Sequence, residues 1–211
     1  ERLADVGNID FALQAQQLGT GHAVIMCKDQ LAKHDGPVVV VAGDSPMMQS
    51  SSIAALLQEF ESSNPACILG TLLHDDPTGL GRIVRDSDNK FTGIVEHKDA
   101  TEEQRAIQES NSGIMLFDGP WLWENLDKVS LSPQGEYYLT DMPGIAVAQG
   151  RHVEGLIIDE REVMGVNNRV QLAEASQELW ARRRQTLLLE GVALLDPNSV
   201  WVDADVTIGR E

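Results

Sequence analysis

The sequence is poor in cysteine, in aromatic residues and in basic residues. Only two of its 211 residues are cysteines and 5% are aromatic, and 16 Lys and Arg stand against 33 Asp and Glu, for a net charge of −17. Two cysteines are too few for a disulfide scaffold or a cysteine metal cluster, so Cys27 and Cys67 are predicted to be free thiols in a reducing cytoplasm. So acidic a chain lacks the basic surface that nucleic acid or an anionic membrane requires, and we expect neither as a partner.

Long apolar runs and the familiar catalytic motifs are missing as well. No apolar run approaches the roughly 20 residues that span a bilayer. The GxxxxGK[ST], HExxH, CxxC and GxSxG motifs do not occur, and the five histidines lack metal-ligand spacing. The sequence therefore gives no support for covalent nucleophilic catalysis. Hydrophobic residues make up 42% of the chain, which is ordinary for a globular protein. The composition predicts a soluble, cytoplasmic globular protein.

The pattern of the first 75 residues alternates between strands and helices. Strands are expected at 11–14, 37–42 and 66–73, with helices from Gly21, capped by Thr20, and over 53–60. The run at 37–42 is apolar without alternation, which is typical of a strand buried on both faces in a parallel sheet. This order predicts a doubly wound α/β sheet.

The regular alternation of predicted strands and helices ends after residue 75. Two antiparallel strands are expected at 80–85 and 91–97, followed by a helix that Thr101 caps. Further strands are expected at 112–117 and 153–158. Further helices are expected at 120–126, from a Thr140 cap to about 149, and at 168–190, where Gly191 stops the helix. The arginines 182–184 are interpreted as a solvated face. Val200, Val202, Val206 and Ile208, separated mainly by small and polar residues, indicate a coil of a hexapeptide β-helix.

Several residues could carry chemistry, each with a structural alternative. Asp44 follows a buried strand, where an acid can hold a metal-bound phosphate. An Asp before Pro46 also suits a turn, and Asp44 considered alone favours this structural interpretation. Residues 19–21 open a helix and suit an anion or a base edge, but the dinucleotide fingerprint fails because Val24 stands at its third glycine. Gln14 and Gln17 offer the donors and acceptors that uracil requires, although surface glutamines are common.

Two charged patterns are open to both readings. Residues 96–99 (Glu-His-Lys-Asp) end an apolar strand, where Glu96 could accept hydrogen bonds from sugar hydroxyls or join a surface ion-pair run. Residues 86–88 and 203–205 match the loose DxD pattern of metal-dependent glycosyltransferases. Both lie in turn-like or coil-like contexts, so we interpret them as structural.

Taken in order, seven short blocks resemble one family. They are residues 13–23 (LQAQQLGTGHA), 43–46 (GDSP), 76–83 (DPTGLGRI), 94–100 (IVEHKDA), 111–113 (NSG), 135–141 (GEYYLTD) and 165–169 (GVNNR). Over nearly its whole length the chain resembles the bacterial bifunctional N-acetylglucosamine-1-phosphate uridyltransferase/glucosamine-1-phosphate acetyltransferases. The blocks at 13–23 and 94–100 are specific to this branch of the sugar nucleotidyltransferases.

The resemblance implies a reaction and a set of roles. The reaction is the Mg²⁺-dependent transfer of UMP from UTP to N-acetylglucosamine 1-phosphate, which yields UDP-N-acetylglucosamine, a cell-wall precursor, and pyrophosphate. By resemblance, Asp44 and Asn167 would bind Mg²⁺ and act in catalysis. The remaining substrate-binding roles would fall to Gln14, Gln17, Gly19 and Thr20 for uracil, Ala42 and Gly43 for the nucleotide and ribose, and Gly81, Glu96 and Asn111 for the sugar.

The same resemblance implies an architecture. It predicts a Rossmann-like mixed sheet, incomplete, at 1–169, a linker helix at 170–190 and the first coil of a left-handed parallel β-helix at 191–211. The chain begins at Glu1 without an initiator Met and stops at Glu211 within an apolar alternation, so we expect an internal piece of a longer protein, which the family makes as a homotrimer.

The sequence also departs from the family. The glycine-rich phosphate loop, with its Arg and the Lys that follows, lies upstream in the family and is absent here, so these 211 residues alone are predicted to be inactive. Ala42 stands where some relatives have Tyr, Ser112 replaces a Thr, and the acetyl-transfer residues lie beyond Glu211. Two alternatives stay open: a nucleotidyltransferase for another sugar or base, and a catalytically dead module that binds sugar nucleotides.

Overall fold

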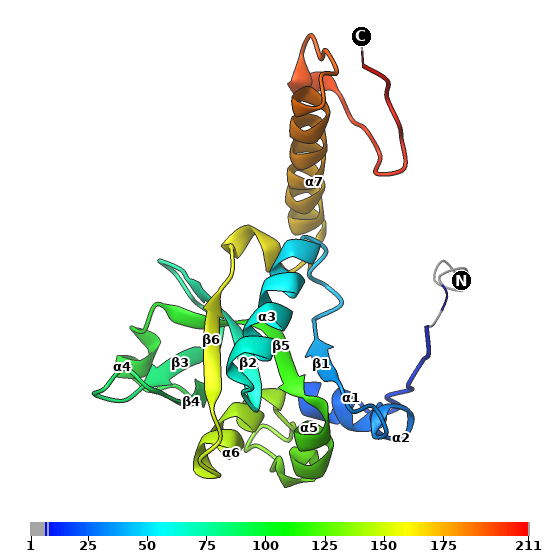
Figure 1. The fold of residues 1–211 in the computed structure, drawn as a ribbon. Helices are drawn as coiled ribbons and strands as arrows, with labels where there is room; N and C mark the ends of the chain where they lie inside the picture. The colour runs from blue at the N-terminus through cyan, green and yellow to red at the C-terminus, as the bar shows by residue number, and fades with distance from the viewer. Residues whose placement is uncertain (1–6, 8, 211) are drawn as a thin grey trace. The chain divides into compact units, whose positions relative to one another are not determined.

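The computed structural model describes residues 7 and 9–210. The chain divides into two compact units, which we describe separately. Unit 1 comprises residues 1–41 and 51–158, and unit 2 comprises residues 42–50 and 159–211. Figure 1 gives the labels of the helices and strands.

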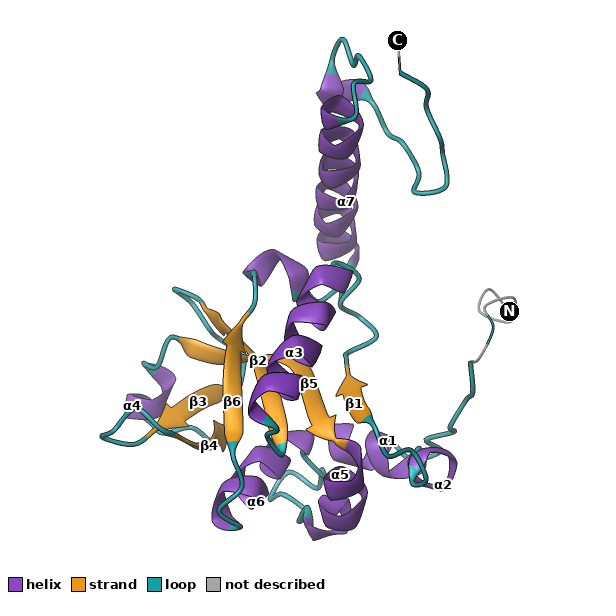
Figure 2. Ribbon diagram, viewed as in Figure 1, coloured by secondary structure: helices purple, strands orange, loops and turns teal. Residues whose placement is uncertain are grey.

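Unit 1 is built on a mixed sheet of six strands (Figure 2). The strands are β1 (Pro37–Val40), β2 (Cys67–Leu73), β3 (Arg82–Arg85), β4 (Phe91–Val95), β5 (Glu109–Asp118) and β6 (Val153–Ile157). Their order is β4-β3-β5-β2-β6, and β1 also pairs with β5, alongside the half of β5 that β3 leaves open. Among the described pairs only β2 and β6 run parallel. The predicted mixed α/β sheet is thereby confirmed.

Short helices flank this sheet. They are α1 (Thr20–Met26), α2 (Lys28–Leu31), α3 (Ser50–Ser63), which begins at the end of unit 2, α4 (Glu102–Arg105), α5 (Gly119–Asn125) and α6 (Met142–Ala148). The main core joins β2 and β5 to α1, α5 and α6 through fully buried side chains such as Leu69, Phe117, Leu122 and Met142. On α3, only Leu56 of the predicted apolar stripe is buried. The hairpin of β3 and β4 and the Thr101 capping box of α4 match the sequence prediction.

Two strand predictions need correction. Residues 11–14 are extended but form no strand, and Phe11 and Leu13 are 73% and 83% exposed, because no strand in the described part of the chain lies beside them to complete a ladder. The predicted buried parallel strand at 37–42 ends at Val40, is only half-buried and pairs antiparallel with β5. An apolar run of this kind indicates a strand buried on both faces, whereas β1 is not fully buried at any position.

Two predicted helix caps are also wrong, because tertiary partners take their hydroxyls. Gly19, not Thr20, is the N-cap of α1, and the Thr20 Oγ1 accepts a hydrogen bond from the Leu139 amide. Thr140 lies inside a 3-10 turn, Leu139–Asp141, that precedes α6, and its hydroxyl donates to Glu96. The helix predicted from Gly21 to Leu31 breaks at Cys27 into α1 and α2.

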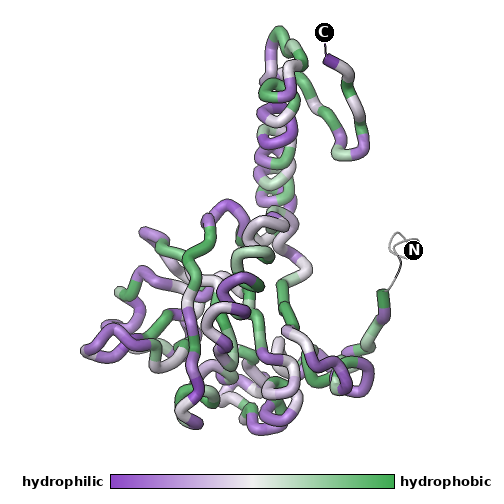
Figure 3. Tube along the Cα trace, viewed as in Figure 1, coloured by the Kyte–Doolittle hydropathy of each residue, from purple (hydrophilic) through white to green (hydrophobic). Residues whose placement is uncertain are grey.

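Unit 2 contains the long helix α7 (Arg169–Leu189), which Gly191 at φ +94° ends, as predicted; Asn168, predicted as its first residue, is instead its N-cap. Figure 3 shows hydrophobic and hydrophilic residues mixed along it. The arginines 182–184 are not merely solvated, since each guanidinium donates to a backbone carbonyl, of Met47, Val206 and Val200 respectively. Within the described residues no helix combines the length and the apolar character needed to cross a bilayer.

The expected β-helix coil is not seen in residues 191–210. This segment contains a 3-10 turn, Pro197–Ser199, and no strand. Its apolar residues instead form a small cluster with the end of α7, built on Leu187, Val192 and Val202. The physical reason is that the strands of a β-helix coil hydrogen bond to the coils stacked above and below, and the described residues hold no second coil.

Candidate active site

The segment that opens α1 is fastened to residues 137–139. The Gly21 amide donates to the Tyr137 carbonyl over 2.8 Å, and the Tyr137 amide donates to the Leu18 carbonyl over 2.8 Å. A Cβ at Gly19 would lie 2.6 Å from the Tyr137 oxygen, and Gly19 has φ +99°. Only glycine tolerates both this backbone conformation and this approach. The predicted Gly19-Thr20-Gly21 turn is therefore a packing junction as well as the start of a helix.

Gln14 is held against the same turn. Its Nε2 donates to the Gly19 carbonyl over 3.0 Å and lies 3.0 Å from His22 Nδ1, while the His22 ring stacks on Tyr137. Both amide protons of the side chain therefore have acceptors within the protein. The geometry leaves the Oε1 atom of Gln14 as the group that can accept a hydrogen bond from a ligand.

A pocket of about 490 Å³ opens at this turn. Its lining residues are Gln14, Gln17, Gly19, Thr20, Ala23, Glu96, Glu136 and Tyr138. All four residues predicted to contact uracil thus share one cavity with Glu96, which was predicted to contact the sugar. Residues 14–20 and Glu96 are far apart in the sequence, and the fold brings them together.

Gly81 lies against Glu96, and Asn111 is hydrogen bonded to Gly81. A Cβ at Gly81 would lie 3.6 Å from both carboxylate oxygens of Glu96 and 2.9 Å from Ile94 Cγ2, so a side chain there would crowd the acid. The Asn111 amide donates to the Gly81 carbonyl over 2.8 Å, which ties β5 to this edge. Gly81, Glu96 and Asn111 therefore form one continuous group.

Sequence reasoning missed the hydroxyl that orients Glu96. Thr140 Oγ1 donates to Glu96 Oε1 over 2.7 Å, across 44 positions of sequence. Burial, together with the negative charge of Glu96, raises the pKa of the neighbouring Asp141. Ala23, Glu136 and Tyr138 also line the pocket without having been assigned a role. Residues 135–141 had been singled out as a block, but nothing in their spacing pointed to Glu96.

Unit 2 brings Asp44 and Asn167 together. The Val166 amide donates to the Asp44 carbonyl over 2.9 Å, and a Cβ at Gly165 would lie 3.8 Å from Asp44 Oδ2 and 3.5 Å from Asn167 Nδ2. Both side chains are exposed. Ala42 and Gly43 precede Asp44 in the same loop, where the Ala42 carbonyl accepts from Ser45 and a Cβ at Gly43 would meet nothing within 4 Å.

The chemistry of this pair suits Mg²⁺. Mg²⁺ takes hard oxygen ligands, keeps several waters and is commonly bound by one or two carboxylates together with substrate phosphates. One carboxylate and one amide in an exposed position match that pattern. The described residues contain no group of three or more His, Cys, Asp and Glu that could hold a metal ion. The pair therefore fits an ion shared with a substrate better than a closed metal centre.

Comparison with known proteins places the chain in a family. The sequence pattern of the family described as "Nucleotidyl transferase" matches residues 1–203. The chain is 45% identical over 205 residues to the bifunctional protein GlmU of Corynebacterium efficiens, covering 96% of this chain and 42% of that protein. It is 44% identical over 210 residues to the bifunctional protein GlmU of Trichlorobacter lovleyi, covering 99% of this chain and 45% of that protein.

The fold agrees with a solved structure of lower sequence identity. A crystal structure of UDP-glucose pyrophosphorylase complexed with UDP-glucose superposes with a TM-score of 0.62 at 15% identity, over 81% of this chain and 65% of that one. The chain spans less than half the length of the two GlmU proteins it matches. It belongs to the nucleotidyl transferase family and is related within it to the bifunctional GlmU proteins.

Proposed function

We propose that this chain carries the uridyl-transfer part of a GlmU-type protein, which joins UTP and N-acetylglucosamine 1-phosphate. The observation that carries the proposal is the 490 Å³ pocket, because it places Gln14, Thr20 and Glu96 in one cavity. An amide for the edge of a base and a carboxylate for sugar hydroxyls are the groups that a nucleoside diphosphate sugar requires. The 45% and 44% identities to GlmU proteins support the same substrates.

The residues of the pocket have separate tasks in this proposal. The Oε1 of Gln14 accepts the N3–H of uracil, while Gln17 and the Gly19-Thr20 backbone contact the remainder of the base. Glu96, oriented by Thr140, accepts hydrogen bonds from sugar hydroxyls, and Asn111 donates to them. Gly81 leaves the space that the sugar ring needs beside the acid.

The chemical step needs alignment rather than a protein nucleophile. A phosphate oxygen of the sugar phosphate attacks the α-phosphorus of UTP, a new P–O bond forms, and the bond to pyrophosphate breaks. Asp44 and Asn167 would hold the Mg²⁺, and Ala42 and Gly43 would contact the nucleotide through their backbone. The ion supplies charge neutralisation on the phosphates. The position of both side chains next to Gly165 supports this assignment.

The proposal extends to the rest of a longer protein. Residues 1–169 would form the transferase domain and 170–190 the linker helix. Residues 191–211, whose described part forms no strand by itself, would become the first coil of an acetyltransferase β-helix when further coils stack on them, and the parent protein would be a homotrimer. We propose that the parent protein acts in the cytoplasm on precursors of peptidoglycan and lipopolysaccharide. The 211-residue chain by itself is expected to bind the sugar nucleotide without turning it over, because the Arg and Lys of the phosphate loop are outside it.

Calorimetric titration of the chain with UDP-N-acetylglucosamine tests the proposal. We expect binding that weakens by about tenfold in Gln14→Ala, since one hydrogen bond to the base is lost. Gln16→Ala is the matched control, because Gln16 is an exposed neighbour outside the pocket. Equal or tighter binding of dTDP-glucose would favour the alternative of another base and sugar. Failure to bind either nucleotide sugar would overturn the proposal.

A kinetic measurement separates the catalytically dead alternative. The protein extended to the length of its GlmU relatives should release pyrophosphate from UTP and N-acetylglucosamine 1-phosphate in a Mg²⁺-dependent manner. Binding without turnover in that longer protein would support a module that only recognises sugar nucleotides.

A further inference from the structure

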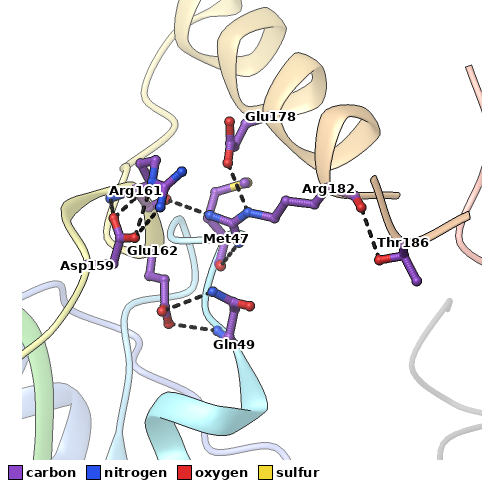
Figure 4. Close-up of polar contacts among 8 residues, drawn as sticks. All are labelled: Met47, Gln49, Asp159, Arg161, Glu162, Glu178, Arg182 and Thr186. Atoms are coloured by element: carbon purple, nitrogen blue, oxygen red, sulfur yellow. Dashed lines mark hydrogen bonds and ion pairs between the residues drawn. The ribbon is translucent and has the colours of Figure 1, made fainter. Parts of the chain in front are cut away.

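The loop that carries Asp44 is anchored at its far end by a buried acid. Glu162 is 4% exposed, and its two carboxylate oxygens both face Gln49. Oε2 accepts from the Gln49 backbone amide over 3.0 Å, and Oε1 accepts from the Gln49 side-chain Nε2 over 3.1 Å (Figure 4). One carboxylate thus fixes both the backbone and the side chain of the last residue before α3.

A second contact holds the same loop two residues earlier. Arg182 of α7 donates from Nη1 to the Met47 carbonyl over 2.8 Å, and its Nε donates to Glu178 over 3.0 Å (Figure 4). Met47 is 1% exposed, so its side chain is packed as well. Asp44 therefore lies in the exposed first half of the 42–49 loop, and hydrogen bonds hold the second half at Met47 and Gln49.

These anchors belong to the segment that also supplies Asn167. Glu162 lies five residues before Asn167, in the 3-10 turn Glu160–Glu162. In the same segment the Val166 amide donates a hydrogen bond to the Asp44 carbonyl, which holds the first half of the 42–49 loop. Glu162 and Val166 therefore hold the 42–49 loop, which carries Asp44, against the same short stretch of chain that carries Asn167.

A buried carboxylate is expensive unless hydrogen bonds compensate its desolvation. Gln49 donates two of the hydrogen bonds that compensate Glu162, so displacing the loop from this position would cost both of them. Asp44 itself is exposed, and the hydrogen bonds described for it involve its backbone. An exposed carboxylate on a loose loop would bind a divalent ion weakly, because ordering the loop would oppose binding.

We propose that Glu162 is a positioning residue for the metal pair: through Gln49 it holds the 42–49 loop so that Asp44 and Asn167 bind one divalent cation together. This inference rests on the proposed function, which assigns the ion to Asp44 and Asn167. It adds a residue outside the ion's own ligands and predicts that the ion's affinity depends on a side chain that does not touch it.

Paramagnetic broadening by Mn²⁺, recorded on the ¹⁵N-labelled chain, tests the inference without any need for turnover. In the wild type, MnCl₂ should broaden the amide signals of Asp44 and Asn167 first. In Glu162→Ala the Mn²⁺ concentration for half-broadening should rise by roughly tenfold, the lower end of what second-layer partners contribute to metal affinity. Glu162→Gln should recover most of the affinity, because its amide can still accept one hydrogen bond from Gln49 and donate another.

Arg161→Gln serves as the matched control in the same turn. Arg161 forms an exposed ion pair with Asp159, and its side chain makes no described contact with the 42–49 loop. Its Mn²⁺ profile should equal that of the wild type. If Glu162→Ala loses the wild-type signal dispersion, Glu162→Asp replaces it, since the shorter acid keeps the charge but withdraws both oxygens from Gln49.

The outcomes distinguish the binding of the ion by Asp44 and Asn167 from the positioning role of Glu162. If Mn²⁺ leaves Asp44 and Asn167 unbroadened in the wild type, the metal assignment in the proposed function fails. If the wild type is broadened there and the Glu162 variants behave identically to it, the metal assignment stands and the positioning role is overturned. A tenfold loss in Glu162→Ala or Glu162→Asp, with recovery in Glu162→Gln and no change in Arg161→Gln, supports the inference.

Discussion

At the scale of single residues, the candidate site depends on how one carboxylate is oriented. Glu96 is half-buried and accepts a 2.7 Å hydrogen bond from the Thr140 hydroxyl. A hydrogen bond to a charged group contributes roughly 1.5–3 kcal/mol. Such a bond leaves Glu96 with one preferred rotamer and one oxygen directed away from Thr140. In the proposed function the Thr140 hydroxyl would therefore contribute to ligand recognition by orienting Glu96, although a sequence pattern suggests only a helix cap.

Removing that hydroxyl should weaken sugar-nucleotide binding. In Thr140→Val the side chain keeps its shape but cannot donate to Glu96, so the affinity for UDP-N-acetylglucosamine should fall by about tenfold, measured by calorimetry. Thr140→Ser retains the donor and should bind like the wild type. Wild-type affinity in Thr140→Val would show that Glu96 needs no orientation by Thr140.

Asp141 should make stability depend on pH. Burial, assisted by Glu96, raises its pKa in the folded state above the value in the unfolded chain. The folded state therefore binds more protons over that interval, and the free energy of unfolding should fall as pH rises through it. Asp141→Asn removes this contribution, so in urea unfolding the wild type should lose more stability than the variant as the pH rises from the usual titration range of aspartate towards neutrality. Parallel pH profiles would contradict the assignment.

At the scale of elements, the beginning of α7 links the candidate metal pair to a helix. Asn168 follows Asn167 and caps α7 with its Oδ1, which accepts from the Val170 and Gln171 amides over 2.9 and 3.0 Å. An N-cap of this kind contributes about 1 kcal/mol. The cap and the proposed metal ligand are thus adjacent residues with different tasks.

The cap can be tested independently of the metal. Asn168→Ala should quicken amide hydrogen exchange in the first turn of α7 by roughly fivefold, since about 1 kcal/mol of local stability is lost. Asn168→Asp keeps an acceptor at the same position and should preserve the wild-type exchange rates. If alanine leaves the exchange of Val170 and Gln171 unchanged, the cap contributes nothing to the end of this helix.

At the scale of the whole molecule, the buried β2 strand reports on the integrity of unit 1. Cys67 is fully buried in the main core, and burial raises the pKa of its thiol. Cys27 is only half-buried at the junction of α1 and α2. The two free thiols of the chain therefore differ in access although they share the same chemistry.

Alkylation should distinguish the two thiols. With iodoacetamide, the native protein should take up one label, at Cys27, while the protein in urea should take up two, as counted by intact mass. Labelling of Cys67 in the native state should be slower by at least about a thousandfold, because it requires opening of the core. Cys27→Ser should remain unlabelled until it is unfolded. Rapid double labelling of the native wild type would contradict the buried position of β2.

Much of the fold could be predicted from local patterns. The hairpin at 82–95, the capping box at Thr101, the strand at 67–73 and the helix that Gly191 ends all rest on signals within a few residues of each other. The errors arose where the deciding partner is distant. Thr20 and Thr140 are suited to capping, but their hydroxyls bond to Leu139 and Glu96. Residues 11–14 read as a strand, but no described strand lies beside them.

By itself the sequence determined an α/β class through its composition and periodicity, and the mixed sheet and the set of candidate residues through the short motifs that carry its family resemblance, because all of these signals act over neighbouring positions. Only the tertiary structure decided which of those residues meet. It joined Gln14, Thr20 and Glu96 in one pocket, brought the Asp44 and Asn167 side chains near Gly165, and bonded Glu162 to Gln49 at the end of the 42–49 loop. Those contacts depend on strand order and on distant hydrogen bonds, such as those that join residues 113 positions apart (Gln49 and Glu162) and 119 positions apart (Thr20 and Leu139), which no local pattern encodes.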